Sequence, residues 1–180
     1  MSEQTLFPDN EEERLKALKR YQILDTPPDD SFDHVAALTA KLFKVPIALV
    51  SLVDEDRIWF KAKYGLEADQ INRDPGLCAS VILAPEVYTI SDTLKDPRTL
   101  ANPLVAGEMG LRFYAAAPLQ THDGYNLGTL CVLDTKPKTL NREDEENLAH
   151  LAKIVMDQME LRLAALTAVR EIKEGRNLTN

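Results

Sequence analysis

Residues 112–134 read RFYAAAPLQTHDGYNLGTLCVLD, and they form the clearest structural pattern in the chain. Two apolar runs, Arg112–Gln120 and Leu127–Asp134, flank a turn that contains Asp123-Gly124. Because a tight hairpin turn needs positive φ angles, which Asp-Gly adopts readily, this pattern predicts two antiparallel strands. Three consecutive alanines in the first run are small enough to let other elements pack closely on both of its faces.

A second hairpin is predicted upstream of the first. The run Ile47–Val53 is almost wholly apolar, which is typical of a central strand covered on both faces. After a turn at residues 54–56, the run Arg57–Tyr64 alternates between apolar and polar side chains. A period of two predicts a half-exposed strand, whose solvent face carries Trp59 and Lys61.

Two helices are predicted before these strands. Glu11–Arg20 is a charged segment with leucines at helical spacing, which indicates a short surface helix. A proline-rich connector follows, and Asp30 is expected to cap the second helix. Pro46 is expected to end that helix, whose predicted apolar stripe consists of Phe32, Val35, Leu38 and Leu42.

The last helix is predicted to be unusually long. Asn141 is a suitable N-cap, and Glu143 and Asp144 complement the helix dipole in the first turn. The helix is expected to run to about Glu174, with Gly175 as its stop. The complete order of elements predicts an α+β fold, in which helices pack against an antiparallel β-sheet.

Between the two hairpins lies a long irregular excursion, Leu66–Gly110, which contains many of the prolines. A short helix is expected within Leu77–Leu83 and an edge strand within Val87–Ile90, with loops elsewhere. Long excursions of this kind inside a domain are usually functional, so we expect a pocket wall. The alternative is a variable surface loop.

The composition of the chain excludes several classes of function. The chain has 180 residues and a net charge of −8, which disfavours nucleic acid and anionic membrane surfaces as partners. No segment is apolar and long enough to span a bilayer, and the polar N-terminus is unlike a signal peptide. Two cysteines make no disulfide framework, so a reduced, cytoplasmic protein is expected. The three histidines are scattered, and no metal site is predicted.

A few side chains are candidates for binding or chemistry. Cys78 begins the short apolar segment of the excursion and is the more reactive thiol candidate, with a core role as the alternative. Asp92 lies in the excursion and either lines a pocket or is a solvated loop charge. Arg112 and Tyr114 point the same way on a strand that enters the sheet. Cys131 lies in mid-strand and is expected to be a buried, inert thiol.

Several stretches of the chain together resemble the GAF family of small regulatory domains. The similarity is to the bacterial subgroup found at the N-terminus of sensor histidine kinases and cyclic-di-GMP enzymes, and it covers residues 11–162. The stretches that carry it are ILDTPP (23–28), IALVSLVD (47–54), RIWFKA (57–62), DTLKDPR (92–98), NPLV (102–105), RFYAAAPL (112–119) and LGTLCVLD (127–134).

The resemblance implies an antiparallel sheet with the N- and C-terminal helices packed together on one face. On the other face it implies a pocket that the excursion closes. It also implies a homodimer formed through the terminal helices, with the last helix passing a signal onward. We therefore expect residues 1–10 to be a disordered tail, 11–162 the domain, and 163–180 a projecting helix end and polar tail.

The resemblance does not transfer a ligand or cofactor. The signature of cyclic-GMP binders is missing, bilin-binding relatives pair cysteine with histidine whereas Cys78 precedes Ala79-Ser80, and haem ligands cannot be assigned. The predicted ligand-binding residues are Cys78, Asp92, Arg112 and Tyr114. The predicted dimer interface consists of Val155, Met159, Leu163 and Leu166.

The leading hypothesis is therefore a cytoplasmic sensory module without enzymatic activity. It would dimerise and transmit a small-molecule or conformational signal to a histidine kinase or cyclic-di-GMP output domain, in the same chain or another. One alternative is an enzyme like the free methionine-R-sulfoxide reductases, which use a cysteine nucleophile. The other is a dimerisation module that binds no ligand.

Overall fold

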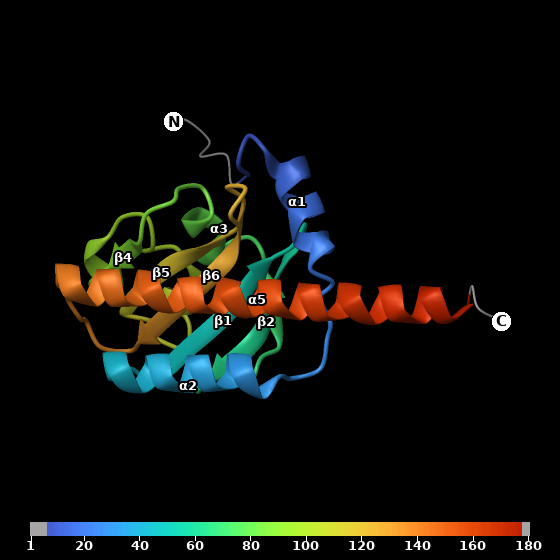
Figure 1. The fold of residues 1–180 in the computed structure, drawn as a ribbon. Helices are drawn as coiled ribbons and strands as arrows, with labels where there is room; N and C mark the ends of the chain where they lie inside the picture. Colours follow the sequence, from blue (N-terminus) through green and yellow to red (C-terminus); the bar gives the residue numbers. More distant parts are fainter. Residues whose placement is uncertain (1–6, 178–180) are drawn as a thin grey trace.

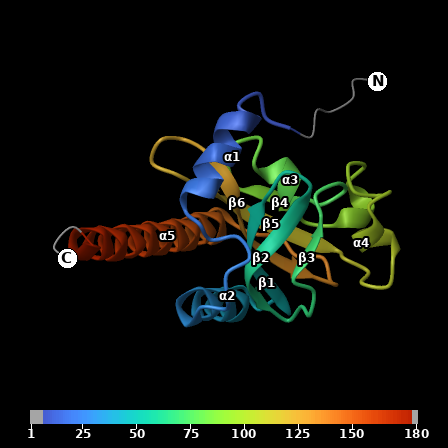
Figure 2. The ribbon, with the colours of Figure 1, turned by 90° about the vertical axis from the view of Figure 1, so that its right-hand side faces the viewer.

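The computed structural model describes residues 7–177, which fold as three layers (Figures 1 and 2). Helices cover one face of a six-stranded sheet, and the excursion covers the other face. The helices are α1 Glu11–Arg20, α2 Asp30–Phe43, α3 Cys78–Val81, α4 Pro103–Ala106 and α5 Arg142–Asn177, with a 3-10 turn at Thr93–Lys95. The strands are β1 Ile47–Val53, β2 Arg57–Tyr64, β3 Gln70–Asn72, β4 Tyr88–Ile90, β5 Phe113–Gln120 and β6 Asn126–Asp134.

The strand order is β3-β2-β1-β6-β5-β4, and every neighbouring pair is antiparallel. Both predicted hairpins are present, and β1 and β6 meet at the centre of the sheet. Gly128 permits this contact, because a Cβ at that position would overlap the backbone oxygen of Ser51 on β1. The predicted α+β class is thus confirmed, and the excursion adds β3 and α4, which the sequence did not indicate.

Strand β2 is not half-exposed, so that prediction is wrong. Trp59 and Lys61 are only 8% and 4% exposed. The pairing with β1 shifts between Phe60 and Ala62, and this bulge leaves Lys61 without a partner in the ladder. The Lys61 ammonium instead donates to Thr26 Oγ1 at 2.9 Å and to the carbonyl of Pro27 at 2.8 Å. The connector before α2 therefore covers the face that was expected to meet solvent.

Helix α2 packs on β1 and β2, but through a different face from the predicted one. Phe32 is buried as expected, whereas Leu38 and Leu42 are more than half exposed. The buried face follows Phe32, Ala36, Ala40 and Phe43, because small alanines let the helix approach the sheet closely. The N-cap is Asp29, which accepts from the amide of Ser31, rather than Asp30.

Helix α5 lies beside α2 on the same face and packs against β5 (Figure 1). Asn141 caps it as predicted: its side chain accepts from the amide of Asp144 at 2.8 Å, and the Asp144 carboxylate accepts from the amide of Asn141 at 3.1 Å. The helix passes through Gly175, so that residue does not end it. Glycine stops a helix where it adopts the left-handed conformation, and the φ angle of Gly175 is not positive.

Helix α1 is fastened to the turn between β1 and β2. Arg14 is 1% exposed and donates to the carbonyl of Val53 at 2.8 Å and to both carboxylate oxygens of Glu11. Glu11 also pairs with Arg73, on which the ring of Phe7 stacks at 4.3 Å. Phe7 and residues 8–10 belong to the segment 1–10 that was expected to be a disordered tail, and residues 1–6 of that segment lie outside the described residues.

Between residues 7 and 177, no helix combines the length and the apolar character needed to cross a membrane.

Candidate ligand-binding site

The candidate site lies between the sheet and the excursion, on the face opposite α2 and α5 (Figure 2). A cavity of about 190 Å³ separates them. Strands β1, β5 and β6 form its floor, and α3 and the segment around α4 form its roof. Its lining is almost wholly apolar and consists of Leu49, Phe60, Leu66, Ala68, Ile71, Leu77, Cys78, Leu104, Met109, Tyr114, Cys131 and Leu133.

Four polar side chains meet where Cys78 of α3 approaches the sheet. The Cys78 sulfur lies 3.2 Å from the Tyr114 hydroxyl and 3.4 Å from the hydroxyls of both Ser51 and Thr129. The Ser51 and Thr129 hydroxyls are 2.7 Å apart across the β1–β6 pair. All four residues are buried, so each polar atom is satisfied by another member of the cluster.

The thiols of Cys78 and Cys131 have pKa values that are shifted in opposite directions. The Cys131 thiol next to Cys78 and the hydroxyls of Ser51, Thr129 and Tyr114 lower the pKa of Cys78 to about 6, against the effect of burial. The same interaction with Cys78, together with burial, raises the pKa of Cys131 well above its usual value. Burial likewise raises the pKa of Tyr114, which stays protonated and able to donate.

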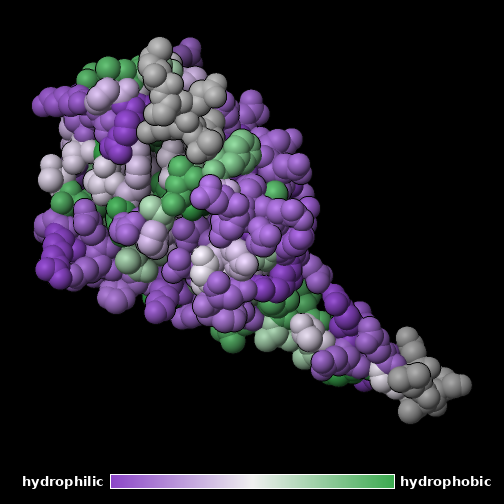
Figure 3. Space-filling view, turned by 90° about the horizontal axis from the view of Figure 1, so that it is seen from above, coloured by the Kyte–Doolittle hydropathy of each residue, from purple (hydrophilic) through white to green (hydrophobic). Residues whose placement is uncertain are grey.

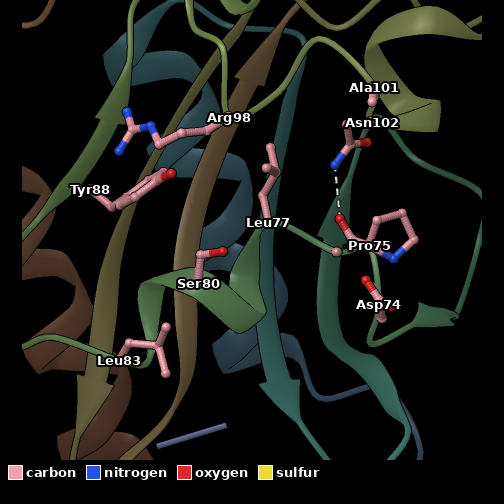
Figure 4. Close-up of a pocket in the computed structure, with 10 residues that line it drawn as sticks. Asp74, Pro75, Leu77, Ser80, Leu83, Tyr88, Arg98, Ala101 and Asn102 are labelled. Atoms are coloured by element: carbon pink, nitrogen blue, oxygen red, sulfur yellow. Dashed lines mark hydrogen bonds between the residues drawn. The ribbon is translucent and has the colours of Figure 1, made fainter. Parts of the chain in front are cut away.

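A wider groove of about 550 Å³ runs along the outside of α3 (Figure 4). On one side the guanidinium of Arg98 lies over the ring of Tyr88 at 4.9 Å, and Asp96 holds it through Nε at 2.9 Å. On the other side Asn102 donates to the carbonyl of Pro75 at 2.8 Å. The remaining lining residues are Asp74, Gly76, Leu77, Ser80, Leu83 and Ala101.

The groove and the cavity are neighbours. Leu77 lines both of them. The rings of Tyr88 and Tyr114 meet edge to face, with centroids 6.3 Å apart. The groove contributes the Tyr88 ring, the Arg98 guanidinium and hydrogen-bonding groups, and the cavity contributes an apolar interior. This combination suits a small molecule with one polar or aromatic end and one apolar end.

The structure brings together two of the four predicted ligand-binding residues. Cys78 and Tyr114 both line the cavity. Asp92 and Arg112 line neither the cavity nor the groove. They pair with each other at 3.1 Å, and Asp92 also caps the 3-10 turn at Thr93–Lys95, so their position indicates that they fix the excursion to the start of β5.

Sequence reasoning missed Ser51, Thr129, Tyr88 and Arg98. A usable pattern existed for Ser51 and Thr129, since each is a lone hydroxyl in an otherwise apolar central strand. A polar residue at such a position needs a buried partner. Tyr88 and Arg98 had no comparable pattern, because loop geometry alone brings them together.

The predicted dimer interface is corrected in part. Val155 and Met159 are 0% and 1% exposed and pack against the sheet within the domain, so neither is available to a second chain. Leu163 and Leu166 lie farther along α5 and are partly exposed, and their role in a dimer stays a prediction. In Figure 3 hydrophobic side chains occur among hydrophilic ones where α5 leaves the domain.

The comparisons with known proteins agree with this architecture. The family model of the GAF domain matches residues 27–159, so the chain belongs to the GAF domain family. The chain is 38% identical over 175 residues to a cyclic di-GMP phosphodiesterase of Pseudomonas aeruginosa. This match takes in 97% of the chain but only 29% of that relative's length.

Solved structures share the fold at lower identity. The GAF domain of an Acinetobacter phosphoenolpyruvate-protein phosphotransferase is 21% identical with a TM-score of 0.61, over 91% of this chain and 98% of that one. Free methionine-R-sulfoxide reductase from Neisseria meningitidis is 20% identical with a TM-score of 0.63, over 86% and 90% of the two chains.

Proposed function

We propose that this GAF domain is a cytoplasmic regulatory module without enzymatic activity of its own. A small molecule in the groove and cavity biases the position of α5, which transmits the signal to an output domain. The 38% identity to part of a cyclic di-GMP phosphodiesterase supports cyclic-di-GMP turnover as the regulated output. A histidine kinase is the other output that the family resemblance implies.

The observation that carries this proposal is the position of β5 between the site and α5. Tyr114 on β5 faces the cavity, while its neighbours Phe113 and Ala115 belong to the core beneath α5. The adjacent strand β4 carries Tyr88 of the groove, and the hydroxyl of Thr89 reaches Glu145 in the first turn of α5 at 3.5 Å. A ligand that displaces either tyrosine therefore acts on strands that contact α5 directly.

Native mass spectrometry of the full chain, purified directly from a cytosolic host, tests the proposal. We expect a homodimer that carries a discrete additional mass, and we expect Tyr88→Ala and Arg98→Ala to lose that mass. Lys95→Ala is the matched control, because Lys95 is 84% exposed and lines neither the groove nor the cavity. It is expected to retain the mass.

Two outcomes contradict the proposal. A dimer with nothing bound favours the module that only dimerises. A thiol-dependent reduction of free methionine sulfoxide that disappears in Cys78→Ser contradicts a purely regulatory role.

A further inference from the structure

Both cysteines of the chain line the cavity, and each thiol affects the pKa of the other. Cys78 is the first residue of α3, and Cys131 lies on β6 opposite Leu49 of β1 and Ala116 of β5. Both are free thiols, and both are buried. Helix α3 packs on β6, so the two sulfurs come from elements that face each other across the interior.

The pair is chemically asymmetric. Three hydroxyls, those of Ser51, Thr129 and Tyr114, lie within 3.4 Å of the Cys78 sulfur and can donate to it. The pKa of Cys78 is lowered to about 6 by the Cys131 thiol and these hydroxyls, whereas that of Cys131 is raised. One sulfur is thus stabilised as the nucleophilic thiolate, and its neighbour keeps its proton until the first has reacted.

The cavity gives one kind of reagent access to both sulfurs. Cys78 and Cys131 both line it, and none of its lining residues carries a formal charge apart from the Cys78 thiolate. An apolar chamber of about 190 Å³ excludes highly hydrated ions and admits a small uncharged molecule.

We propose that Cys78 and Cys131 are a peroxide-sensitive thiol pair that closes to a reversible intramolecular disulfide. In the first step the Cys78 thiolate attacks one oxygen of hydrogen peroxide, the O–O bond breaks, and hydroxide leaves and is protonated to water. This step oxidises Cys78 to the sulfenic acid. In the second step the Cys131 sulfur attacks the sulfur of that sulfenic acid, the S–O bond breaks, and water leaves with the proton of Cys131. Overall two thiols and one peroxide give one disulfide and two waters.

The bond would change the same cavity that the proposed ligand uses. In the disulfide, whose two Cβ atoms lie about 4 Å apart, the Cys78 sulfur is bonded to Cys131 and is no longer the thiolate that accepts a hydrogen bond from the Tyr114 hydroxyl. Tyr114 then loses a partner at the point where it meets Tyr88. The inference does not depend on the proposed function, because oxidation of the pair is measured without any ligand or output domain.

Thiol counting by mass spectrometry tests the pair. The reduced chain is treated with hydrogen peroxide, then denatured and alkylated. We expect the wild-type chain to lose two hydrogens and to take up no alkyl group, to remain a single chain on a non-reducing gel, and to recover both thiols with dithiothreitol. Two alkylated cysteines, or a disulfide between two chains, would overturn the proposal.

Variants separate the two roles. In Cys131→Ser we expect a sulfenic acid on Cys78 that dimedone captures, and in Cys78→Ser we expect Cys131 to stay unreacted. If Cys131 in Cys78→Ser is oxidised as fast as the wild-type pair, Cys78 is not the attacking sulfur and the proposal fails.

A conservative variant keeps both cysteines and guards against misfolding. Tyr114→Phe removes one donor to the Cys78 sulfur and is expected to raise the thiol pKa by about one unit, so at about pH 5, below both pKa values, its oxidation is expected to be about tenfold slower. Tyr125→Phe is the matched control, since Tyr125 packs on the helix side of the sheet. Equal rates in the two variants would contradict the assigned role of the hydroxyl cluster.

Discussion

Arg14 is one of the largest fully buried side chains of the described structure, and its charge is held by Glu11 and by the carbonyl of Val53. Removing Arg14 takes a buried donor from the carbonyl of Val53 and leaves Glu11 with Arg73 as its remaining partner. We expect Arg14→Ala to lower the free energy of unfolding by about 3 kcal/mol. Urea denaturation measures this change.

The control for Arg14 is Lys16→Ala on the same helix. Lys16 is 69% exposed, and its pair with Glu12 is solvated. We expect no measurable change in the free energy of unfolding, because an exposed ion pair is screened by water and salt. Equal losses in the two variants would show that Arg14 does not anchor α1.

Cys78 makes stability depend on pH. Its folded pKa of about 6 lies below the ordinary thiol value of 9.0, so between these values the unfolded chain binds a proton that the folded chain does not. The stabilisation from the thiolate is therefore complete above about pH 9 and is lost as the pH falls through about 6. We expect the difference in unfolding free energy between wild type and Cys78→Ser to grow from pH 6 to pH 9; a flat difference would contradict the lowered pKa.

Residues of the candidate site could be predicted from the sequence where the residue type and its position in a local element determine the direction of the side chain. Tyr114 was chosen because it lies on a strand that enters the sheet, and Cys78 because it begins an apolar segment, and both line the cavity. Asp92 and Arg112 line neither the cavity nor the groove, and their mutual ion pair depends on how the excursion folds back onto β5. Nothing in the spacing of two residues 20 positions apart in the chain reveals such a pair.

Among helices and strands, the hairpins and α5 were predictable because turn chemistry, caps and periodicity are local. Strand β3 was missed because its three residues include a single apolar side chain, whereas the equally short β4 lies within the predicted edge strand Val87–Ile90. The burial of β2 was missed because Lys61 is covered by Thr26 and Pro27, far away in sequence. Likewise, the sheet and not the helix determines which face of α2 is buried, so Leu38 was expected inside but is exposed.

The β1–β6 pair offers a test at the level of elements. Gly128→Ala places a methyl group against the backbone oxygen of Ser51 and forces the two central strands apart. We expect a loss of more than about 2 kcal/mol in unfolding free energy, measured by thermal or urea denaturation. Gly175→Ala, where nothing lies within 4 Å of the added methyl group, is expected to stabilise by up to about 1 kcal/mol. A tolerated Gly128→Ala would mean that the central pair can widen freely.

At the scale of the whole molecule, the predicted homodimer can be tested by measuring the oligomeric state. Leu163 and Leu166 are the partly exposed members of the predicted interface. We expect Leu163→Glu combined with Leu166→Glu to give a monomer by light scattering, because two buried carboxylates oppose association. Leu94→Glu is the control, since Leu94 is an exposed leucine in the 3-10 turn of the excursion and does not belong to α5. A dimer that survives the double change would exclude this part of α5 as the interface.

The continuity of α5 has a geometric consequence. The helix has 36 residues and rises about 1.5 Å per residue, so it is a single rod of about 54 Å whose rotation is set by the core at its base. For any segment that continues α5, the number of helical residues before it determines its orientation about the helix axis. Inserting one residue beyond Leu163 turns everything after it by about 100°, while inserting seven restores almost the original direction. Under the proposed function, the signal would be transmitted as a rotation of α5 about its axis, and residues could be inserted into α5 only in numbers that preserve this orientation.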